Sequence, residues 1–203
     1  MKNYIKPILF TVLTAGLFTG CVGDDDFALA PFDELAYSEN FEEAVDGTVL
    51  DIQGWTNFAQ SGAKKWTEER FPLSDGNGYA EFSTFNSGDA TNVAWLVSPA
   101  INIDGTGKNI SFDAAQHHLD SPSNTLEVFV SSDFNGTDVA AATWTELEAT
   151  LPTQADDWYD FINSGPVSLA AYSGNIYIAF KVKGSGTDTT LDGAYQIDNL
   201  KLF

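Results

Sequence analysis

The sequence predicts an all-β fold, specifically an antiparallel jelly-roll β-sandwich. Apolar and polar residues alternate along several short segments, and clusters of Gly, Asn, Asp and Ser typical of turns separate these segments. Helical periodicity is nearly absent after Tyr37. Because strands follow one another without intervening helices, an antiparallel sandwich fits this pattern better than a parallel α/β sheet.

The alternating segments, taken in order, indicate roughly nine or ten strands. A first strand is predicted near Glu39–Phe41 and a last one at Tyr195–Phe203, and in a jelly roll these two strands would pair. The clearest segments between them lie at 110–115, 126–131, 145–151 and 176–183. In the last of these, Ile176, Ile178 and Phe180 recur at every second position, which predicts one buried face.

The composition narrows the possible functions. The 203 residues include 29 Asp and Glu against 9 Lys and Arg, a formal net charge of −20, with 13% aromatic residues and one cysteine. The length and aromatic content suffice for one sizeable core, so one folded domain is expected. The negative charge excludes nucleic-acid binding, which needs a basic surface. The single cysteine excludes an intrachain disulfide and a thiolate zinc or iron–sulfur site.

Residues 1–20 have the pattern of a lipoprotein signal peptide. Lys2 and Lys6 precede an apolar run at 8–18 that is too short to cross a bilayer. Cys21 stands directly after Gly20, as in bacterial lipoprotein signals, which are cleaved before a cysteine whose thiol carries the lipid. Residues 21–36 are predicted to be a lipidated acidic tether, and residues 37–203 the jelly-roll domain. We therefore expect a lipid-anchored outer-membrane protein exposed at the cell surface, with the N-terminal lipid as its membrane contact.

The acid triplet Asp24–Asp26 in this tether allows two interpretations. It resembles the export signal of Bacteroidetes surface lipoproteins. It is equally consistent with a solvated, charge-extended tether. Both interpretations place the domain outside the cytoplasm.

Short motifs follow one another over residues 37–203, among them ENFE at 39–42, NGYA at 77–80, WLVSPAI at 95–101 and IDNL at 197–200. Their order resembles the choice-of-anchor J and cleaved-adhesin domains. These are jelly-roll modules of Bacteroidetes surface proteins, similar in build to MAM domains and to carbohydrate-binding, galactose-binding-like jelly rolls. The resemblance implies an adhesive or carbohydrate-binding role.

The resemblance also implies a structural calcium ion, Ca2+. Its ligands would be Glu39 of the first strand and Asp198 of the last, with Asp75 or Asn77 from a loop. Hard oxygen ligands of this kind suit calcium. An alternative remains open, in which Asp198 caps a turn through backbone N–H groups and Glu39 is solvated.

The tryptophans suggest where a sugar could bind, because aromatic faces stack on pyranose rings. Trp66 and Trp158 are flanked by charged residues and, with Tyr159, are the candidates for exposed platforms. Half-buried structural tryptophans are the alternative. Trp95 and Trp144 lie in apolar or alternating segments and are expected to pack in the interior.

Catalysis has little support in the sequence. His117 and His118 are adjacent, so on a regular strand they would point to opposite faces and could not serve one metal or one base. No nucleophile elbow, zincin, Walker or dinucleotide motif is present. We therefore expect no enzyme.

Three hypotheses follow for the function. The first is a surface-anchored, non-catalytic module that binds an extracellular glycan or a surface protein and contains a structural calcium. The second is a docking or scaffolding subunit of an outer-membrane complex. The third is a glycoside hydrolase, which would need two carboxylates about 5–10 Å apart.

Overall fold

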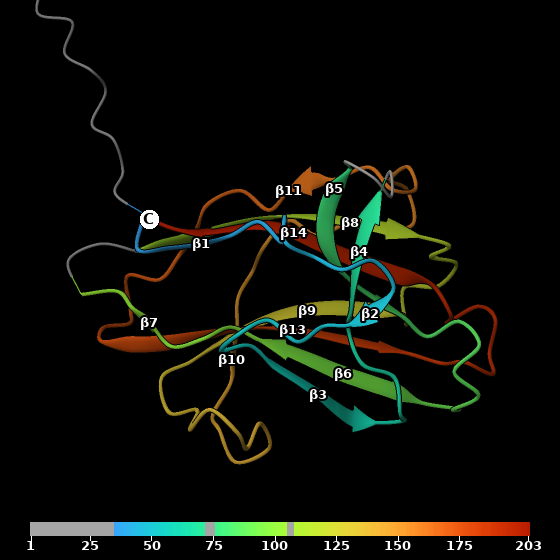
Figure 1. Ribbon diagram of the computed structural model, residues 1–203, viewed down its shortest axis with the longest axis horizontal. Helices are drawn as coiled ribbons and strands as arrows, with labels where there is room; N and C mark the ends of the chain where they lie inside the picture. Colours follow the sequence, from blue (N-terminus) through green and yellow to red (C-terminus); the bar gives the residue numbers. More distant parts are fainter. Residues whose placement is uncertain (1–34, 72–75, 105–107) are drawn as a thin grey trace, which may run out of the picture. The chain divides into compact units, whose positions relative to one another are not determined.

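The computed structural model describes residues 35–71, 76–104 and 108–203, and all regular structure in these ranges is β. Fourteen strands form two antiparallel sheets that stack face to face (Figure 1). Among the described residues, no helix is long and apolar enough to cross a membrane. The predicted antiparallel β-sandwich is confirmed.

One sheet has eight strands, in the order β11-β8-β14-β5-β4-β2, with β1 beside β14 and β12 beside β8. Its strands are β1 (Tyr37–Glu39), β2 (Thr48–Val49), β4 (Thr67–Phe71), β5 (Asn77–Ser83), β8 (Asn109–His117), β11 (Ile162–Asn163), β12 (Val167–Ser168) and β14 (Ala194–Leu202).

The other sheet has six strands, in the order β10-β9-β13-β6-β3, with β7 beside β13. Its strands are β3 (Thr56–Ser61), β6 (Asn92–Val97), β7 (Ile101–Asn102), β9 (Thr125–Ser131), β10 (Thr145–Glu146) and β13 (Asn175–Gly184).

The first and last strands pair, as predicted. Tyr37 lies opposite Leu202 and Glu39 opposite Leu200. The first strand ends earlier than expected, because Phe41 adopts a left-handed backbone conformation (φ 49°) that turns the chain away from β14.

The predicted strand at 145–151 is wrong beyond its first two residues. Thr145 and Glu146 pair with β9, and the Leu147 N–H still donates to the Val128 carbonyl at 2.8 Å. The Thr150 N–H, however, donates to Ser164 beside β11 of the eight-stranded sheet (3.2 Å). The segment crosses from one sheet to the other, so its alternating apolar residues fill the gap between the sheets and form no ladder.

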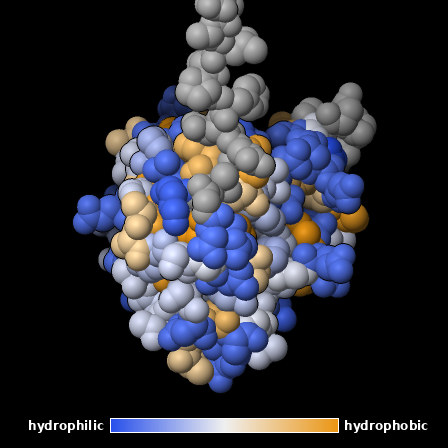
Figure 2. Space-filling model, turned by 90° about the vertical axis from the view of Figure 1, so that its left-hand side faces the viewer, coloured by the Kyte–Doolittle hydropathy of each residue, from blue (hydrophilic) through white to orange (hydrophobic). Residues whose placement is uncertain are grey.

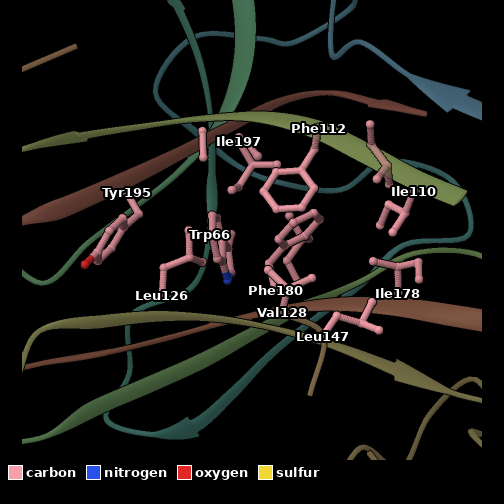
Figure 3. Close-up of a cluster of buried hydrophobic side chains, with 14 of the residues drawn as sticks. Trp66, Ile110, Phe112, Leu126, Val128, Leu147, Ile178, Phe180, Tyr195 and Ile197 are labelled. Atoms are coloured by element: carbon pink, nitrogen blue, oxygen red, sulfur yellow. The ribbon is translucent and has the colours of Figure 1, made fainter. Parts of the chain in front are cut away.

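The core lies between the two sheets and collects the inward-facing residue of each alternating pair (Figure 3). The rings of Phe112 and Phe180, one from each sheet, meet edge to face with centroids 5.1 Å apart. Trp66, directly before β4, packs on Phe82 of β5 at 5.7 Å. Burial of these apolar side chains is the main source of stability.

A second apolar cluster covers the outer face of the six-stranded sheet. Trp95 of β6 and Trp144 lie with ring centroids 5.4 Å apart, and Phe134 packs on Trp144 at 5.6 Å. The loop that carries Phe134 and Trp144 is held closed by the Asp133 carboxylate, which accepts the Thr143 N–H at 2.8 Å. Trp95 is buried, as predicted, whereas Trp144 is only partly buried, and both pack in this outer cluster and not between the sheets.

Much of the remaining surface is polar. On the face that Figure 2 shows, hydrophobic residues form small patches separated by hydrophilic ones. Scattered apolar residues of this kind are ordinary on a folded protein. The outer face of the eight-stranded sheet differs, because aromatic side chains gather there around two hollows.

Candidate functional site

The larger hollow, here called the aromatic groove, has a volume of about 650 Å³ and lies on the outer face of the eight-stranded sheet. Strand alternation explains it, since Gly78, Ala80 and Phe82 of β5 face the core and Tyr79 therefore faces outward. The lining residues that the structure describes bear aromatic rings or amides, with no carboxylate among them: Phe71, Asn77, Tyr79, Tyr159, Phe161 and Gln196.

The rings in the groove are held in place by one another. Tyr79 and Phe161 meet edge to face, with centroids 5.8 Å apart. Burial, and then the nearby Glu81 carboxylate, raise the pKa of Tyr79 to about 12. The phenol is therefore protonated and neutral at any physiological pH, and it can donate a hydrogen bond as well as offer a ring face.

The smaller hollow, here called the histidine pocket, has a volume of about 380 Å³ and adjoins the groove. Its lining is Glu81, Ser83, Phe85, His117, His118, Asp120 and Asp192. A row of polar groups separates the two hollows. The Gln196 side-chain amide donates to Glu81 Oε2 at 2.8 Å, and His117 Nε2 lies 3.3 Å from the same oxygen.

The two histidines lie together, so the prediction that they point to opposite faces is wrong. His117 Nδ1 and His118 Nδ1 are 2.8 Å apart. Strand β8 ends at His117, and His118 adopts a left-handed backbone conformation (φ 55°). The period of two that sends neighbouring side chains to opposite faces therefore stops at this point.

Each histidine ring lies on an aromatic ring from the segment before β11. His117 stacks on Tyr159 with centroids 4.6 Å apart and planes 23° apart, and His118 lies 4.1 Å from Trp158. Trp158 and Tyr159 are 52% and 54% exposed. Both side chains are thus about half exposed, which fits the platform and the half-buried alternative alike, and their part in binding stays a prediction.

Trp66 is not a platform, and that part of the prediction is wrong. Its side chain is 0% exposed and points between the sheets (Figure 3). The charged neighbours misled the interpretation, because Glu68 also points inward, where its carboxylate accepts the N–H groups of Val45 (2.8 Å) and Asp51 (3.1 Å).

The predicted calcium ligands do not form one site among the described residues. Glu39 pairs with Leu200, a core residue, whereas Asp198 pairs with Asp113 on the opposite face of the sheet. Glu39 Oε1 accepts the Phe41 N–H at 2.9 Å. Asp75 lies outside the described residues, as does the predicted lipidation site Cys21. No group of three or more His, Cys, Asp or Glu able to hold a metal occurs in the part of the chain that the structure describes.

Asp198 and Asn77 do meet, within a network of amides. Asn77 Nδ2 donates to Asp198 Oδ2 at 2.8 Å, and Asn199 donates its N–H to Oδ1 at 2.6 Å. The Asn199 side-chain amide bridges Asp198 and Asp113, at 3.1 and 3.0 Å. Burial raises the pKa of Asp198, and the negative charges of Asp113 and Glu42 raise it further, against the lowering effect of its hydrogen bonds. Amide donors, including the backbone N–H of the capping alternative, thus satisfy this carboxyl.

Several site residues were missed by sequence reasoning. Tyr79, Glu81, Phe161 and Gln196 lie on β5, on β14 and beside β11, and only the sheet order brings them together. Their outward positions in alternating strands were visible in the sequence. The order of the strands was not.

Comparison with known proteins supports the fold. The K1 cleaved adhesin domain of Lys-gingipain from Porphyromonas gingivalis W83 superposes with a TM-score of 0.56 and 21% sequence identity, covering 82% of this chain and 96% of that one. This chain has a cleaved-adhesin-like fold. The K2 domain of Lys-gingipain gives 0.57 and 16% identity, covering 82% of this chain and 98% of that one. The K3 domain, again from P. gingivalis W83, gives a TM-score of 0.55 and 17% identity, covering 84% of this chain and 99% of that one.

These identities are low, so the cleaved-adhesin-like likeness shows the fold alone. No protein-family model matches the chain, and no curated protein matches it. The function therefore has to be argued from the residues of the site.

Proposed function

We propose that the chain is a non-catalytic binding module that holds a neutral polysaccharide along the outer face of the eight-stranded sheet. The observation that carries the proposal is the aromatic groove, in which ring faces and amide groups line a hollow of about 650 Å³. Aromatic faces cover the C–H faces of sugar rings, while amides and hydroxyls hydrogen-bond the sugar hydroxyls. An open groove of this kind suits a chain that enters and leaves at its ends.

The neighbouring histidine pocket extends the same surface. Tyr159 contributes to the groove and stacks on His117 of the pocket, so a bound chain could continue from one hollow into the other. Glu81 accepts hydrogen bonds there and would orient hydroxyl groups. Because Glu81, Asp120 and Asp192 line this pocket, anionic polysaccharides would be repelled.

The proposal includes the location expected from the first 36 residues, namely a lipid anchor at Cys21 on the outer membrane with the domain at the cell surface. The lipoprotein-like pattern of residues 1–21 supports it.

A binding screen of the folded protein against soluble neutral glucan, xylan and mannan, with polygalacturonate as the anionic comparison, tests this function. We expect retention by a neutral polysaccharide and no binding to polygalacturonate. A parallel assay for new reducing ends checks that binding occurs without cleavage. The proposal fails if no neutral polysaccharide binds, or if reducing ends appear.

A protein-docking surface is the second candidate. Phe71 and Phe85 on the same face are 72% and 59% exposed, and exposed aromatic residues are common at protein interfaces. Cell-surface crosslinking of the wild type and of Phe71→Ser distinguishes the two functions. A crosslinked partner lost in Phe71→Ser, together with no polysaccharide binding, would favour docking.

A further inference from the structure

The segment between β1 and β2 is fitted closely against the end of the eight-stranded sheet. Phe41 in this segment is buried, and its carbonyl oxygen lies so close to Gly78 that a Cβ at position 78 would clash with it. Position 78 in β5 therefore admits only glycine. The segment belongs to no strand, so contacts other than strand pairing must hold it against the sheet.

Arg70 of β4, the only arginine of the chain, holds this segment in place. Arg70 of β4 donates Nη2–H to the Glu42 carbonyl, Nη1–H to the Gly76 carbonyl and Nε–H to the Ala44 carbonyl (3.4 Å). Arg70 Nη1 also lies 3.4 Å from Glu42 Oε2, and the Arg70 side chain is 18% exposed. Three carbonyl oxygens and one carboxylate thus surround a single guanidinium group.

Glu68, two residues earlier on β4, binds the same segment with the opposite polarity. Its carboxylate accepts the N–H of Val45 in this segment and the N–H of Asp51 just after β2, and its own carbonyl accepts the Gly47 N–H at 2.9 Å. Because alternate residues of a strand share a face, Glu68 and Arg70 point the same way. One side chain takes the N–H groups of the segment and the other takes its carbonyls.

This arrangement disagrees with the calcium ion expected from the sequence. Carbonyl and carboxylate oxygens that converge on one point can bind a hard cation such as calcium. Here the guanidinium group of Arg70 lies at that point. The expected ligands Glu39 and Asp198 face opposite sides of the sheet. We infer that Arg70 supplies the cation that fastens the first strand's extension to the sheet, so that the fold is stable without calcium.

Thermal unfolding of the full chain tests this inference in two arms. In the first, the wild-type Tm is measured in calcium and in EDTA, and we expect a difference of less than about 1 °C, because a bound ion would raise it by mass action. In the second, Arg70→Met should lower the Tm by roughly 5–10 °C, since three charge-assisted hydrogen bonds are lost. Lys201→Met, an exposed cation on β14, is the matched control and should leave the Tm nearly unchanged.

Hydrogen exchange locates the effect. In Arg70→Met, amides at 42–47 should exchange at least about tenfold faster than in the wild type, while those of β13 are protected as before. Arg70→Lys keeps the positive charge but not the planar guanidinium donors, so its Tm and its exchange rates at 42–47 should lie between those of the wild type and of Arg70→Met. This variant keeps the test decisive if Arg70→Met does not fold. A wild-type Tm that rises by several degrees in calcium, or an Arg70→Met protein as stable and as protected as the wild type, would overturn the inference.

Discussion

Replacement of Tyr159 by alanine removes the ring that joins the groove to the histidine pocket. Tyr159 is 54% exposed and stacks on His117 at 4.6 Å, so one part of its surface is packed and the other is free for a ligand. An aromatic side chain presents roughly 200 Å², of which about half is free here. A sugar ring stacked on the free face of Tyr159 would cover about 50–80 Å² of this area.

At about 25 cal/mol per Å², this contact is worth about 1–2 kcal/mol. Tyr159→Ala should therefore raise the Kd for a bound neutral polysaccharide about 5- to 30-fold. Tyr159→Phe keeps the ring and should change the Kd by less than about threefold. The backbone is not expected to rearrange, because the Tyr159 N–H still donates to the Gln116 carbonyl at 2.9 Å.

Isothermal titration calorimetry of the wild type and both variants measures these ratios, and circular dichroism verifies folding. Val49→Ala, at an exposed position outside both hollows, is the matched control and should bind like the wild type. A folded Tyr159→Ala protein whose Kd equals that of the wild type would show that the ligand lies elsewhere.

Three further predictions concern stability and location. Trp66→Ala empties a site that is fully buried between the sheets, so urea unfolding should show a loss of about 3–5 kcal/mol; a loss below about 1 kcal/mol would contradict the packing described. Burial raises the pKa of Asp198 in the folded state, so the stability linked to this group is full below its ordinary pKa and falls as pH rises through the raised value. Asp198→Asn should consequently match the wild-type Tm near pH 3 and equal or exceed it at pH 7, and a lower Tm at pH 7 would contradict the stated environment. Cys21→Ser should move the protein from the membrane fraction to the soluble fraction, and an unchanged membrane pool would refute lipid anchoring.

Much of the fold could be predicted from the sequence because it depends on a local pattern. In β13, inward residues at every second position from Ile176 to Val182 are buried, as their spacing indicates. The pairing of the first and last strands also followed, from the expected jelly roll. The segment at 147–151 shows the limit, since its alternation is the same whether apolar residues line a ladder or fill the space between two sheets.

The candidate site could not be predicted in this way, because two features that are not local in the sequence decide which residues it contains. Strand order places Tyr79 of β5 near Gln196 of β14, although 117 residues separate them in the numbering. Charge is the second such feature, since the lysines and glutamates around Trp66 suggested that its side chain is exposed. Glu68 is instead buried, because backbone N–H groups from a distant segment satisfy its carboxylate.

The histidine pair shows why periodicity fails where function is most expected. Binding residues gather at strand ends and in connections, where the backbone leaves the extended conformation. His118 and Tyr159 both have left-handed backbone conformations (φ 55° and 63°), and these two turns bring four aromatic rings into one cluster. Non-glycine residues rarely adopt this conformation, and it persists when surrounding contacts hold it. We therefore expect His118→Gly to relax the backbone at this position yet weaken binding, because the ring that rests on Trp158 is lost along with the strain.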